Sequence, residues 1–418
     1  MSEPLTKSKV FFKTFGCRTN IYDTQMMIGE LKDFEVTTSE LFADIIIVNS
    51  CTVTNGADSG VRNYISKQNK DGKKVIFAGC GADTRGSELF AQNRVFGVLG
   101  HSEKRNINRL LFSKEPFKEI GILTHVDESI VSNYHDKSKA FIKIQEGCNF
   151  SCSYCIIPHA RGKARSQSEE KILEQGKILL QNGFSEFVLT GTNIGSYGKD
   201  TDTSLGKLLQ KIGAMDGVKR VRMGSIEPVQ IDESFKEVLK EPWLEKHLHI
   251  ALQHTNDEML KIMRRRNSAK RDLELFLELS SLGFALGTDF IVGHPGESME
   301  IWQNALINFK KFPLTHLHAF CYSKRDGTLS ASMKQTVDGN TAKSRLKELQ
   351  NIIKENNFIF RQKKIDLQVL VEEKKDGFYT GFDQFYNRIF IDSGDDLAGK
   401  WIVIDDYEAK KEGNYAAF

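Results

Sequence analysis

Residues 148–155 read Cys-Asn-Phe-Ser-Cys-Ser-Tyr-Cys, so three of the chain's seven cysteines lie in one short stretch, here called the loop trio. Three neighbouring thiols cannot all pair with one another in disulfides, which favours a metal centre. Structural zinc usually takes four Cys or His ligands, and the nearest further candidate is His159. The loop trio is more typical of a cubane iron–sulfur cluster that leaves one iron without a protein ligand. We therefore expect an iron–sulfur centre, with zinc as the alternative.

Three further cysteines, here called the strand-end trio, each follow a short apolar run. The runs are residues 10–15 before Cys17, residues 45–48 before Cys51, and residues 75–78 before Cys80. Helix-like patterns at residues 23–32 and 60–69 separate the runs, which predicts a parallel α/β sheet. A single free cysteine is commonly a core residue, but the carboxyl ends of parallel strands meet at one edge of the sheet. We therefore predict a second three-cysteine cluster site.

A second series of strands begins just before the loop trio. Residues 140–144 form the first strand-like run, and strand-like and helix-like patterns alternate from there. The further strand candidates are residues 187–190, 218–223, 248–252, 290–292 and 316–322, and the helix candidates include residues 169–180, 258–266 and 272–282. Six β/α units are fewer than the eight of a closed barrel. We therefore predict a partial (β/α)6 barrel with the loop trio at the carboxyl edge of its strands.

The pattern changes after a basic, helix-compatible stretch at residues 345–364. Short β-like runs then predict a small β-barrel; they are residues 367–371, 388–391 and 401–404. The expected fold class is α/β in three parts: a parallel-sheet domain at residues 1–135, the partial barrel at residues 136–360 and the β-barrel at residues 361–418. Residues 101–140 are interpreted as the end of the first domain and a linker.

The composition is that of an ordinary globular protein, with 40% hydrophobic and 27% charged residues among 418 and a formal net charge of +3. So small a charge does not identify a partner. The N-terminus lacks an apolar signal core, and no run approaches the roughly 18 apolar residues of a membrane span, so we expect no membrane contact and a cytoplasmic location. Seven sparse cysteines do not form a disulfide framework, which favours reduced thiols or metal ligands.

Two basic stretches are candidates for contacting a nucleic acid, residues 161–165 and residues 264–271, although a solvated face explains either equally well. The C-terminal part is a weaker candidate, because residues 364–418 hold seven Lys or Arg against twelve Asp or Glu. His316 and His318 lie beside Cys321 and allow a metal site. Alternate positions on a strand followed by an apolar cysteine are more often packing, which is the interpretation we favour.

The loop trio and residues 156–166 behind it, Ile-Ile-Pro-His-Ala-Arg-Gly-Lys-Ala-Arg-Ser, resemble the CxxxCxxC signature of radical S-adenosylmethionine (SAM) enzymes in the extended form of the methylthiotransferases. The later blocks similar to that family are residues 188–193, 224–228, 289–297 and 320–328. The strand-end trio resembles the family's N-terminal cluster domain, and the C-terminal part its small TRAM barrel. Two departures are Gln167, where the family carries a basic residue, and residues 251–257, Ala-Leu-Gln-His-Thr-Asn-Asp in place of Pro-Leu-Gln-Ser-Gly-Ser-Asp.

The resemblance implies two 4Fe–4S clusters and SAM as cofactors. The cysteines implied as iron ligands are Cys148, Cys152 and Cys155 for the cluster that binds and cleaves SAM, and Cys17, Cys51 and Cys80 for the cluster that supplies sulfur. The resemblance also places Tyr154 and Ile291 against the adenine and Glu227 near groups that it polarises. Core packing is the ordinary alternative for Tyr154 and Ile291, and a paired carboxylate is the alternative for Glu227.

Within the family, residues 49–54, Asn-Ser-Cys-Thr-Val-Thr, resemble the branch that adds a methylthio group to C2 of N6-threonylcarbamoyladenosine at tRNA position 37. The alternatives are the same chemistry on isopentenyladenosine in tRNA or on an aspartate of a ribosomal protein, and a non-catalytic iron–sulfur or zinc RNA-binding sensor. The implied partners are the tRNA anticodon loop and an electron donor such as a flavodoxin or ferredoxin, without a stable protein partner.

Overall fold

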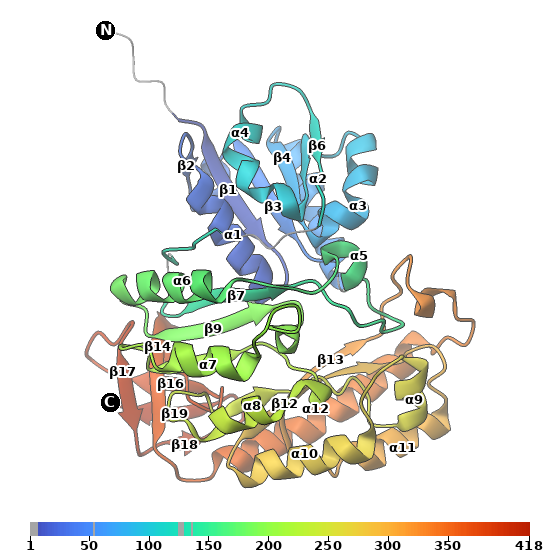
Figure 1. Ribbon diagram of the computed structural model, residues 1–418, viewed down its shortest axis with the longest axis vertical. Coiled ribbons are helices and arrows are strands. Elements are labelled where there is room, and N and C mark those ends of the chain that lie inside the picture. Colours follow the sequence, from blue (N-terminus) through green and yellow to red (C-terminus); the bar gives the residue numbers. More distant parts are fainter. Residues whose placement is uncertain (1–6, 53–54, 124–128, 135–136) are drawn as a thin grey trace.

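The computed structural model describes residues 7–52, 55–123, 129–134 and 137–418. Some expectations fall on residues outside these ranges. Val53 and Thr54 belong to the 49–54 motif, residues 124–128 belong to the stretch interpreted as a linker, and residues 135 and 136 form the first predicted domain boundary. Seen as a whole, the chain forms an N-terminal sheet with its helices, a central barrel, and a C-terminal sheet (Figure 1).

The N-terminal part is a parallel sheet of six strands in the order β2-β1-β3-β4-β5-β6. The strands are β1 Lys9–Thr14, β2 Glu35–Val36, β3 Ile45–Ser50, β4 Lys74–Gly79, β5 Gly97–Leu99 and β6 Phe117–Glu119. The helices are α1 Arg18–Glu30, α2 Asn55–Lys70, α3 Cys80–Ala91, α4 Ile107–Leu111 and the 3-10 turns η1 Glu40–Phe42 and η2 His101–Asn106. The predicted parallel sheet is therefore confirmed, and the stretch interpreted as a linker contributes a further strand and helix to it.

The strands that carry the strand-end trio are neighbours in this sheet. β3 pairs in parallel with β1 on one side and with β4 on the other. Every residue of β3 is buried, as expected of an inner strand of a parallel sheet covered on both faces. The carboxyl ends of the three strands therefore meet at one edge of the sheet.

The central part contains the six parallel strands that the sequence predicts. They are β7 Ala140–Glu146, β9 Glu186–Gly191, β10 Arg220–Met223, β11 His247–His249, β12 Ala285–Val292 and β13 Leu314–Cys321, with the short antiparallel β8 Arg165–Ser166 beside β7. β7, β9 and β10 form one sheet, and β11, β12 and β13 form another. Parallel bridges from Val221 to Leu244 and from Ile226 to Ile250 join the two sheets, which completes a partial barrel.

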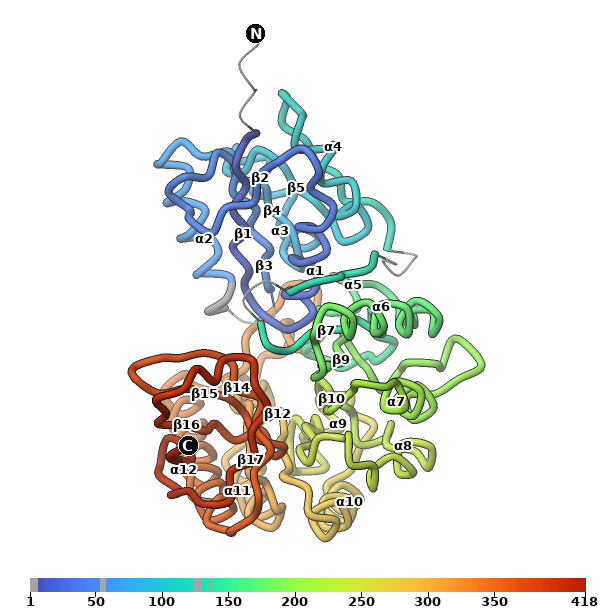
Figure 2. Tube along the Cα trace, turned by 90° about the vertical axis from the view of Figure 1, so that its left-hand side faces the viewer, coloured from blue at the N-terminus to red at the C-terminus, as the bar shows by residue number. Residues whose placement is uncertain are grey.

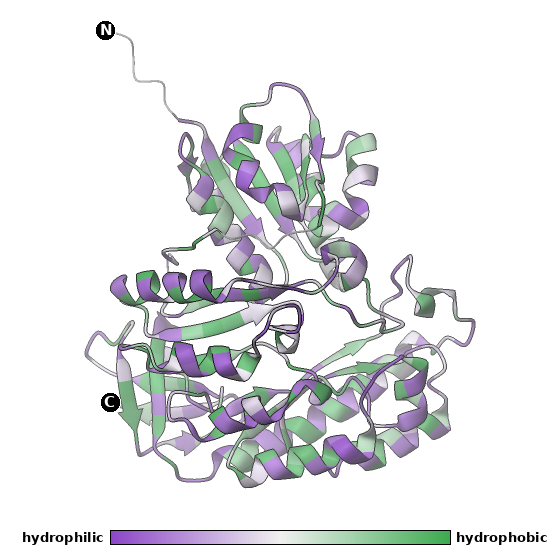
Figure 3. Ribbon diagram, viewed as in Figure 1, coloured by the Kyte–Doolittle hydropathy of each residue, from purple (hydrophilic) through white to green (hydrophobic). Residues whose placement is uncertain are grey.

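Helices of the central part alternate with its strands, and their ribbons carry hydrophobic residues interspersed with hydrophilic ones (Figure 3). They are α5 Ile157–Arg161, α6 Glu169–Gln181, α7 Leu205–Gly213, α8 Glu233–Glu237, α9 Asp257–Ile262, α10 Ala269–Ser281, α11 Met299–Phe309 and α12 Gly339–Arg361, with 3-10 turns η3 Ile194–Ser196, η4 Pro228–Gln230, η5 Val238–Lys240 and η6 Leu329–Ser332. The predicted helix at residues 258–266 is too long, because Arg264 adopts a left-handed φ of 54° that a helix does not allow.

The C-terminal part is a curled sheet of six strands in the order β17-β14-β15-β16-β19-β18. Its strands are β14 Leu367–Lys375, β15 Phe378–Phe382, β16 Arg388–Asp392, β17 Trp401–Ile404, β18 Glu408–Ala409 and β19 Asn414–Ala417. They pair antiparallel except for β16 with β19, and they enclose a separate apolar core. The architecture agrees with the predicted small barrel, although the sequence analysis missed β15, β18 and β19.

The N-terminal and C-terminal parts both pack against the barrel (Figure 2). One hydrophobic core contains Tyr22 and Met26 of α1 together with residues of the barrel strands, so the N-terminal part and the barrel share a core. On the other side, the Arg220 guanidinium donates to the carbonyl groups of Gln368 and Phe382 in the C-terminal sheet. Among the described residues, no helix is long and apolar enough to cross a membrane.

Candidate active site

All six cysteines of the two trios line one cavity of about 700 Å³. The strand-end trio reaches it from the N-terminal sheet: Cys17 precedes α1, Cys51 follows β3, and Cys80 is the first residue of α3. The loop trio reaches it from the connection between β7 and α5. All of these cysteines are free thiols. The structure therefore brings together two cysteine groups that lie far apart in the sequence.

The turn that precedes Cys17 packs closely against Cys51 of the same trio. Gly16 has a φ of 97°, and a Cβ atom placed on it would lie 2.4 Å from Cys51 Cβ and 2.9 Å from Cys51 Sγ. Burial raises the pKa of the Cys80 thiol, while Arg161 opposes that effect through its charge and a 3.2 Å hydrogen bond from Nε to Sγ. The glycine thus leaves the space that the cysteines need.

The loop trio is held by backbone and side-chain donors. The backbone N–H of Phe150 and the side-chain amide of Asn193 donate to Cys148 Sγ over 3.4 Å and 3.5 Å. Burial raises the pKa of the Cys155 thiol to about 12, and burial also raises that of Cys152, against the opposing charge of Arg265. An N–H donor aimed at cysteine sulfur is one of the means by which proteins tune iron–sulfur clusters.

The donor set fits iron–sulfur clusters better than zinc. Each trio offers three sulfur ligands and thereby leaves one iron of a cubane open. His159, the fourth ligand that zinc would need, is exposed and is not among the residues that line the cavity.

The three further residues implied in cofactor binding all line the same cavity. Tyr154 and Ile291 pack on an apolar group formed by Met259, Met263 and Ile301, so an apolar wall adjoins the loop trio. An aromatic and an aliphatic side chain on such a wall suit the faces of a planar base. Tyr154 and Ile291 therefore pack on an apolar core group and also line the cavity.

The Glu227 carboxylate is held in an ion pair, which is the alternative that the sequence analysis gave for this residue. The Arg265 guanidinium makes a two-pronged ion pair with Glu227, donates to the Ala251 carbonyl oxygen over 2.6 Å, and lies 3.7 Å from Cys152 Sγ. Arg265 is buried, with only 2% of its side chain exposed. Glu227 therefore positions a cation beside the loop trio.

Two arginines of the basic stretches are buried and are therefore excluded as contacts for a nucleic acid. The Arg161 and Arg265 side chains are both enclosed in ion pairs and cannot reach a phosphate. The residues of these stretches that stay exposed are Lys163, Arg264, Arg266, Lys270 and Arg271. The Arg266 guanidinium lies over the ring of Phe150, 4.3 Å from its centroid, and Phe150 lines the cavity.

A buried ion network behind the cysteines was missed by the sequence reading. Asp23 on α1 receives Lys104 at 2.5 Å, Lys143 at 3.0 Å and Arg161 at 3.2 Å, and Glu146 also pairs with Lys143 and Arg161. The charges of these cations hold the pKa values of Asp23 and Glu146 low, although burial acts in the opposite direction. A single signal was available: Lys143 interrupts an otherwise apolar strand.

Four histidines form another part of the cavity lining. The sequence analysis considered His316 and His318 as a metal site and favoured packing, and it missed His247 and His249. His247 and His249 on β11 and His316 and His318 on β13 line the cavity together with Asp289 on β12. Burial lowers the pKa of His247 and lowers that of His316 to about 3, so both rings are neutral. Cys321 lines the cavity near the end of β13.

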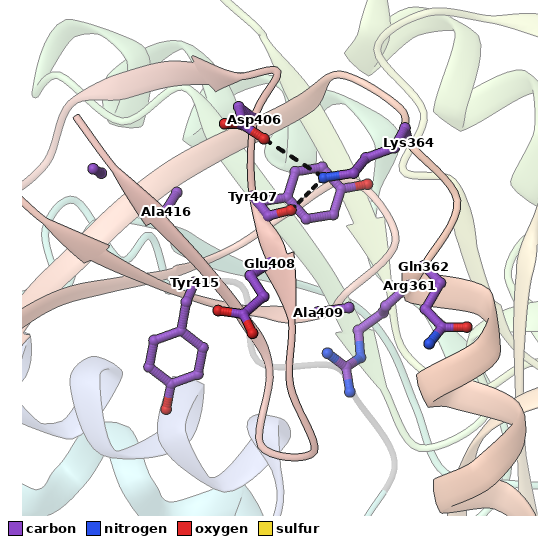
Figure 4. A pocket seen from close by; sticks show the side chains of 10 residues that line it. Arg361, Gln362, Lys364, Asp406, Tyr407, Glu408, Ala409, Tyr415 and Ala416 are labelled. Carbon is purple, nitrogen blue, oxygen red and sulfur yellow. Dashed lines mark hydrogen bonds and ion pairs between the residues drawn. The ribbon is translucent and has the colours of Figure 1, made fainter.

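A second hollow, of about 530 Å³, lies on the C-terminal sheet and carries no comparable chemistry (Figure 4). Its lining includes Arg361 and Lys364, which are both engaged by the protein itself. Lys364 Nζ lies 3.6 Å from Asp406 and donates to the carbonyl oxygen of Tyr407, while Arg361 donates to Asn414 and to the Lys410 carbonyl oxygen. The cavity of the six cysteines is therefore the candidate active site.

A partial barrel with a CxxxCxxC loop at the carboxyl edge of its strands defines a radical SAM enzyme. The family model described as "Radical SAM superfamily" matches residues 142–306, and the one described as "Uncharacterized protein family UPF0004" matches residues 9–100. The fold is similar to that of the radical S-adenosylmethionine methyltransferase TsrM from Kitasatospora setae, with a TM-score of 0.59, 15% identity, and coverage of 78% of this chain and 77% of that chain.

Relatives that match most of the chain identify the particular family. A Helicobacter pylori (strain ATCC 700392 / 26695) protein named "Putative methylthiotransferase" is 50% identical over 98% of this chain and 100% of its own length. The Bacillus subtilis (strain 168) "Threonylcarbamoyladenosine tRNA methylthiotransferase MtaB" is 32% identical over 94% of this chain and 93% of its own. The Halalkalibacterium halodurans "tRNA-2-methylthio-N(6)-dimethylallyladenosine synthase" is 32% identical over 88% of this chain and 73% of its own.

The chain therefore belongs to the radical SAM methylthiotransferases and is a transferase. The cofactors of this family are SAM and two 4Fe–4S clusters, as the resemblance implied. Two groups of three free cysteines around one cavity match that requirement in number and in ligand type.

Proposed function

We propose that the protein adds a methylthio group to C2 of N6-threonylcarbamoyladenosine at position 37 of tRNA. The observation that carries the proposal is the shared cavity: both cysteine trios line it, so one substrate carbon is within reach of both. Relatives named for tRNA modification, at about the same identity, support a tRNA substrate. The choice between their two modified adenosines rests on residues 49–54, which resemble the threonylcarbamoyladenosine branch.

In this proposal Cys148, Cys152 and Cys155 hold the cluster that binds SAM, and Cys17, Cys51 and Cys80 hold the cluster that supplies sulfur. When bound, these cofactors provide the electron, the radical, the sulfur and the methyl group, which no side-chain acid or base provides. The protein's own contribution is positioning. Arg161 and Arg265 place a positive charge beside one sulfur of each trio, which favours an anionic cluster at that place.

The remaining cavity wall has the features that an adenosine needs. Tyr154 and Ile291 offer an apolar surface for a base, and Phe150 with Arg266 offers an aromatic ring and an exposed cation beside the loop trio. We infer that the target adenosine is turned out of the anticodon loop into the cavity, at a cost of a few kcal/mol for unstacking. The exposed Lys163, Lys270 and Arg271 are candidates for the flanking phosphates.

The wider setting follows from this substrate. A one-electron donor such as a flavodoxin or ferredoxin must reduce the loop-trio cluster, and the location is the cytoplasm, where tRNA is modified. We also propose that residues 1–135, 136–360 and 361–418 act as cluster, barrel and TRAM-like parts of one unit. The C-terminal part contributes to the site itself, because Tyr386 lines the cavity.

Mass spectrometry of nucleosides tests the proposal directly. tRNA from cells that lack the protein should lose the methylthio form of threonylcarbamoyladenosine. It should accumulate threonylcarbamoyladenosine that carries no methylthio group. The wild-type gene should restore the methylthio form, and a gene with Cys51→Ala should not. Loss of the methylthio form of isopentenyladenosine instead would assign the other tRNA substrate. Unchanged tRNA nucleosides would exclude tRNA and leave a ribosomal protein or a sensor role to be tested.

A further inference from the structure

Four histidines and one aspartate face the cavity from three adjacent strands. His247 and His249 alternate on β11, His316 and His318 alternate on β13, and Asp289 lies on β12 between them. Residues two apart on a strand point to the same face. The register places Gly287 of β12 between His249 and His316, and Asp289 beside His318. The group therefore forms by topology and not by sequence proximity.

Two of the imidazoles and the carboxylate converge on one point. His249 Nε2 lies 3.2 Å from Asp289 Oδ1, and His318 Nδ1 lies 3.7 Å from the same oxygen. One ligand atom of each of the three residues lies within 4.8 Å of the others. Two imidazoles and a carboxylate at such separations are a usual ligand set for a divalent transition metal.

Gly287 on β12 leaves space for the imidazole rings on the neighbouring strands. A Cβ atom on Gly287 would lie 2.6 Å from His249 Nδ1 and 3.0 Å from His247 Nε2, so the missing side chain provides the space that the rings occupy. Among the described residues, the buried Nε2 atom of His249 faces the Asp289 carboxylate, while the buried Nε2 atom of His247 has no hydrogen-bond partner. Buried polar atoms are rarely left without a partner. A bound ion would take the place of the proton between His249 Nε2 and Asp289 Oδ1, which lie 3.2 Å apart.

A second group of acidic residues and a histidine differs from this one, because its carboxylates are already paired with cationic side chains. Asp23, His101 and Glu146 also come within ligand distance of one another, but Lys104, Lys143 and Arg161 already neutralise their carboxylates. For Asp289, the ion pairs found among the described residues are with His249 and His318 only. The carboxylate there has imidazole partners, which bind metals, in place of ammonium and guanidinium groups, which do not.

We propose that His249 Nε2, Asp289 Oδ1 and His318 Nδ1 bind a divalent transition-metal ion, with zinc as the best match to this ligand set. His318 is 59% exposed at the cavity, so the remaining coordination positions face the space where a substrate would lie. Three protein ligands with an open position are typical of zinc ions that bind a substrate oxygen. The ion is distinct from both cysteine groups and independent of which substrate the protein takes.

Zinc binding to the cluster-loaded protein tests this site. The anaerobic protein, with its iron content verified, is equilibrated with one equivalent of Zn²⁺, desalted, and measured by elemental analysis and by X-ray absorption at the zinc edge. We expect about one zinc per chain, with nitrogen and oxygen neighbours and the outer-shell scattering of imidazole. Absence of retained zinc, or zinc with sulfur neighbours, would overturn the proposal.

Ligand variants locate the ion. Because removal of an outer-shell partner alone costs 10–100-fold in metal affinity, His318→Ala and Asp289→Asn should each weaken zinc binding by at least about 100-fold. His159→Ala, at an exposed histidine outside the cavity, should leave it unchanged. His318→Ala is decisive, because this exposed side chain can be removed without opening the core. Undiminished zinc binding by His318→Ala at normal iron content would refute the site.

Discussion

The Nε atom of Arg161 donates a hydrogen bond to the Sγ atom of Cys80 over 3.2 Å. Arg161 ends the short helix behind the loop trio, whereas Cys80 belongs to the strand-end trio. The same guanidinium donates to Asn20 and Asp23 on α1 and pairs with Glu146 at the end of β7. One buried side chain thus connects the two cysteine groups and the sheets that carry them.

Arg161→Ala should therefore destabilise the whole protein. Removing one partner of a buried ion pair leaves uncompensated charge, which costs about 3–5 kcal/mol of unfolding free energy. Lys163→Ala, an exposed change in the same basic stretch, should cost less than about 0.5 kcal/mol. Anaerobic thermal unfolding of the cluster-loaded variants measures both, and equal midpoints for the two would contradict the role given to the buried network.

Gly16→Ala should disrupt the strand-end trio. The new Cβ atom would lie 2.4 Å from Cys51 Cβ, and the φ of 97° is unfavourable for alanine. Gly72→Ala is the matched control, because Gly72 also has a positive φ, of 69°, but no atom within 4 Å of the added carbon. The control should lose only about 1–2 kcal/mol of stability. Gly16→Ala should also lower the iron content from about eight toward about four per chain, and full iron content would refute the clash.

Asp83→Asn should stabilise the protein at pH 8 and leave it unchanged below pH 4. Burial raises the pKa of Asp83 to about 7 from 3.8, although Lys104 and Arg161 oppose the shift. The folded protein therefore binds a proton that the unfolded chain releases between these two values, so the free energy of unfolding falls as pH rises from 3.8 to about 7. The loss is on the order of 4 kcal/mol.

Thermal unfolding midpoints across this range measure the effect of Asp83. The difference between Asp83→Asn and the wild type should grow up to about pH 7 and stay constant above it. Asp71→Asn, an exposed change, should show no such dependence. A gain for Asp83→Asn that is the same at pH 4 and pH 8 would show that removal of the charge is not its cause.

Replacing the strand-end trio with alanine should separate two activities. The loop trio alone would still hold one cluster, so SAM cleavage should continue while methylthio transfer stops, and iron should fall from about eight to about four per chain. The matching triple replacement of the loop trio should abolish both activities. Iron counting and detection of the cleaved nucleoside by chromatography measure the outcome. Loss of cleavage in the first variant would show that the two roles are wrongly assigned.

tRNA binding should weaken as salt rises if the exposed basic residues hold phosphates. Each lost phosphate contact reduces the slope of log affinity against log salt by roughly 0.7 for a single-stranded loop. Arg271→Ala, at one of the exposed residues proposed for the flanking phosphates, should weaken binding and lower this slope. Lys211→Ala, on the outer face of the barrel where Lys211 pairs with Glu169, should not. Filter binding at several salt concentrations gives the slopes, and a flat response would exclude electrostatic binding.

The loop trio, the strand-end trio and the six β/α units could all be predicted from the order of the residues. Ligands in residues 148–155 share a neighbourhood in any fold, because so short a segment cannot separate them. The alternation of strand and helix implies parallel strands, and parallel strands bring Cys17, Cys51 and Cys80 to one edge. Both inferences rest on local spacing or on periodicity, and both of these features can be recognised in the order of the residues.

Which side chains lie opposite one another could not be predicted without the tertiary structure. Strand order and the packing of the N-terminal sheet on the barrel place both trios in one cavity and set Asp289 between His249 and His318. Burial also reversed the interpretation of Arg161 and Arg265, from nucleic-acid contacts to internal cations. The physical reason is that the state of a charged side chain depends on partners from distant elements, and periodicity does not specify those partners.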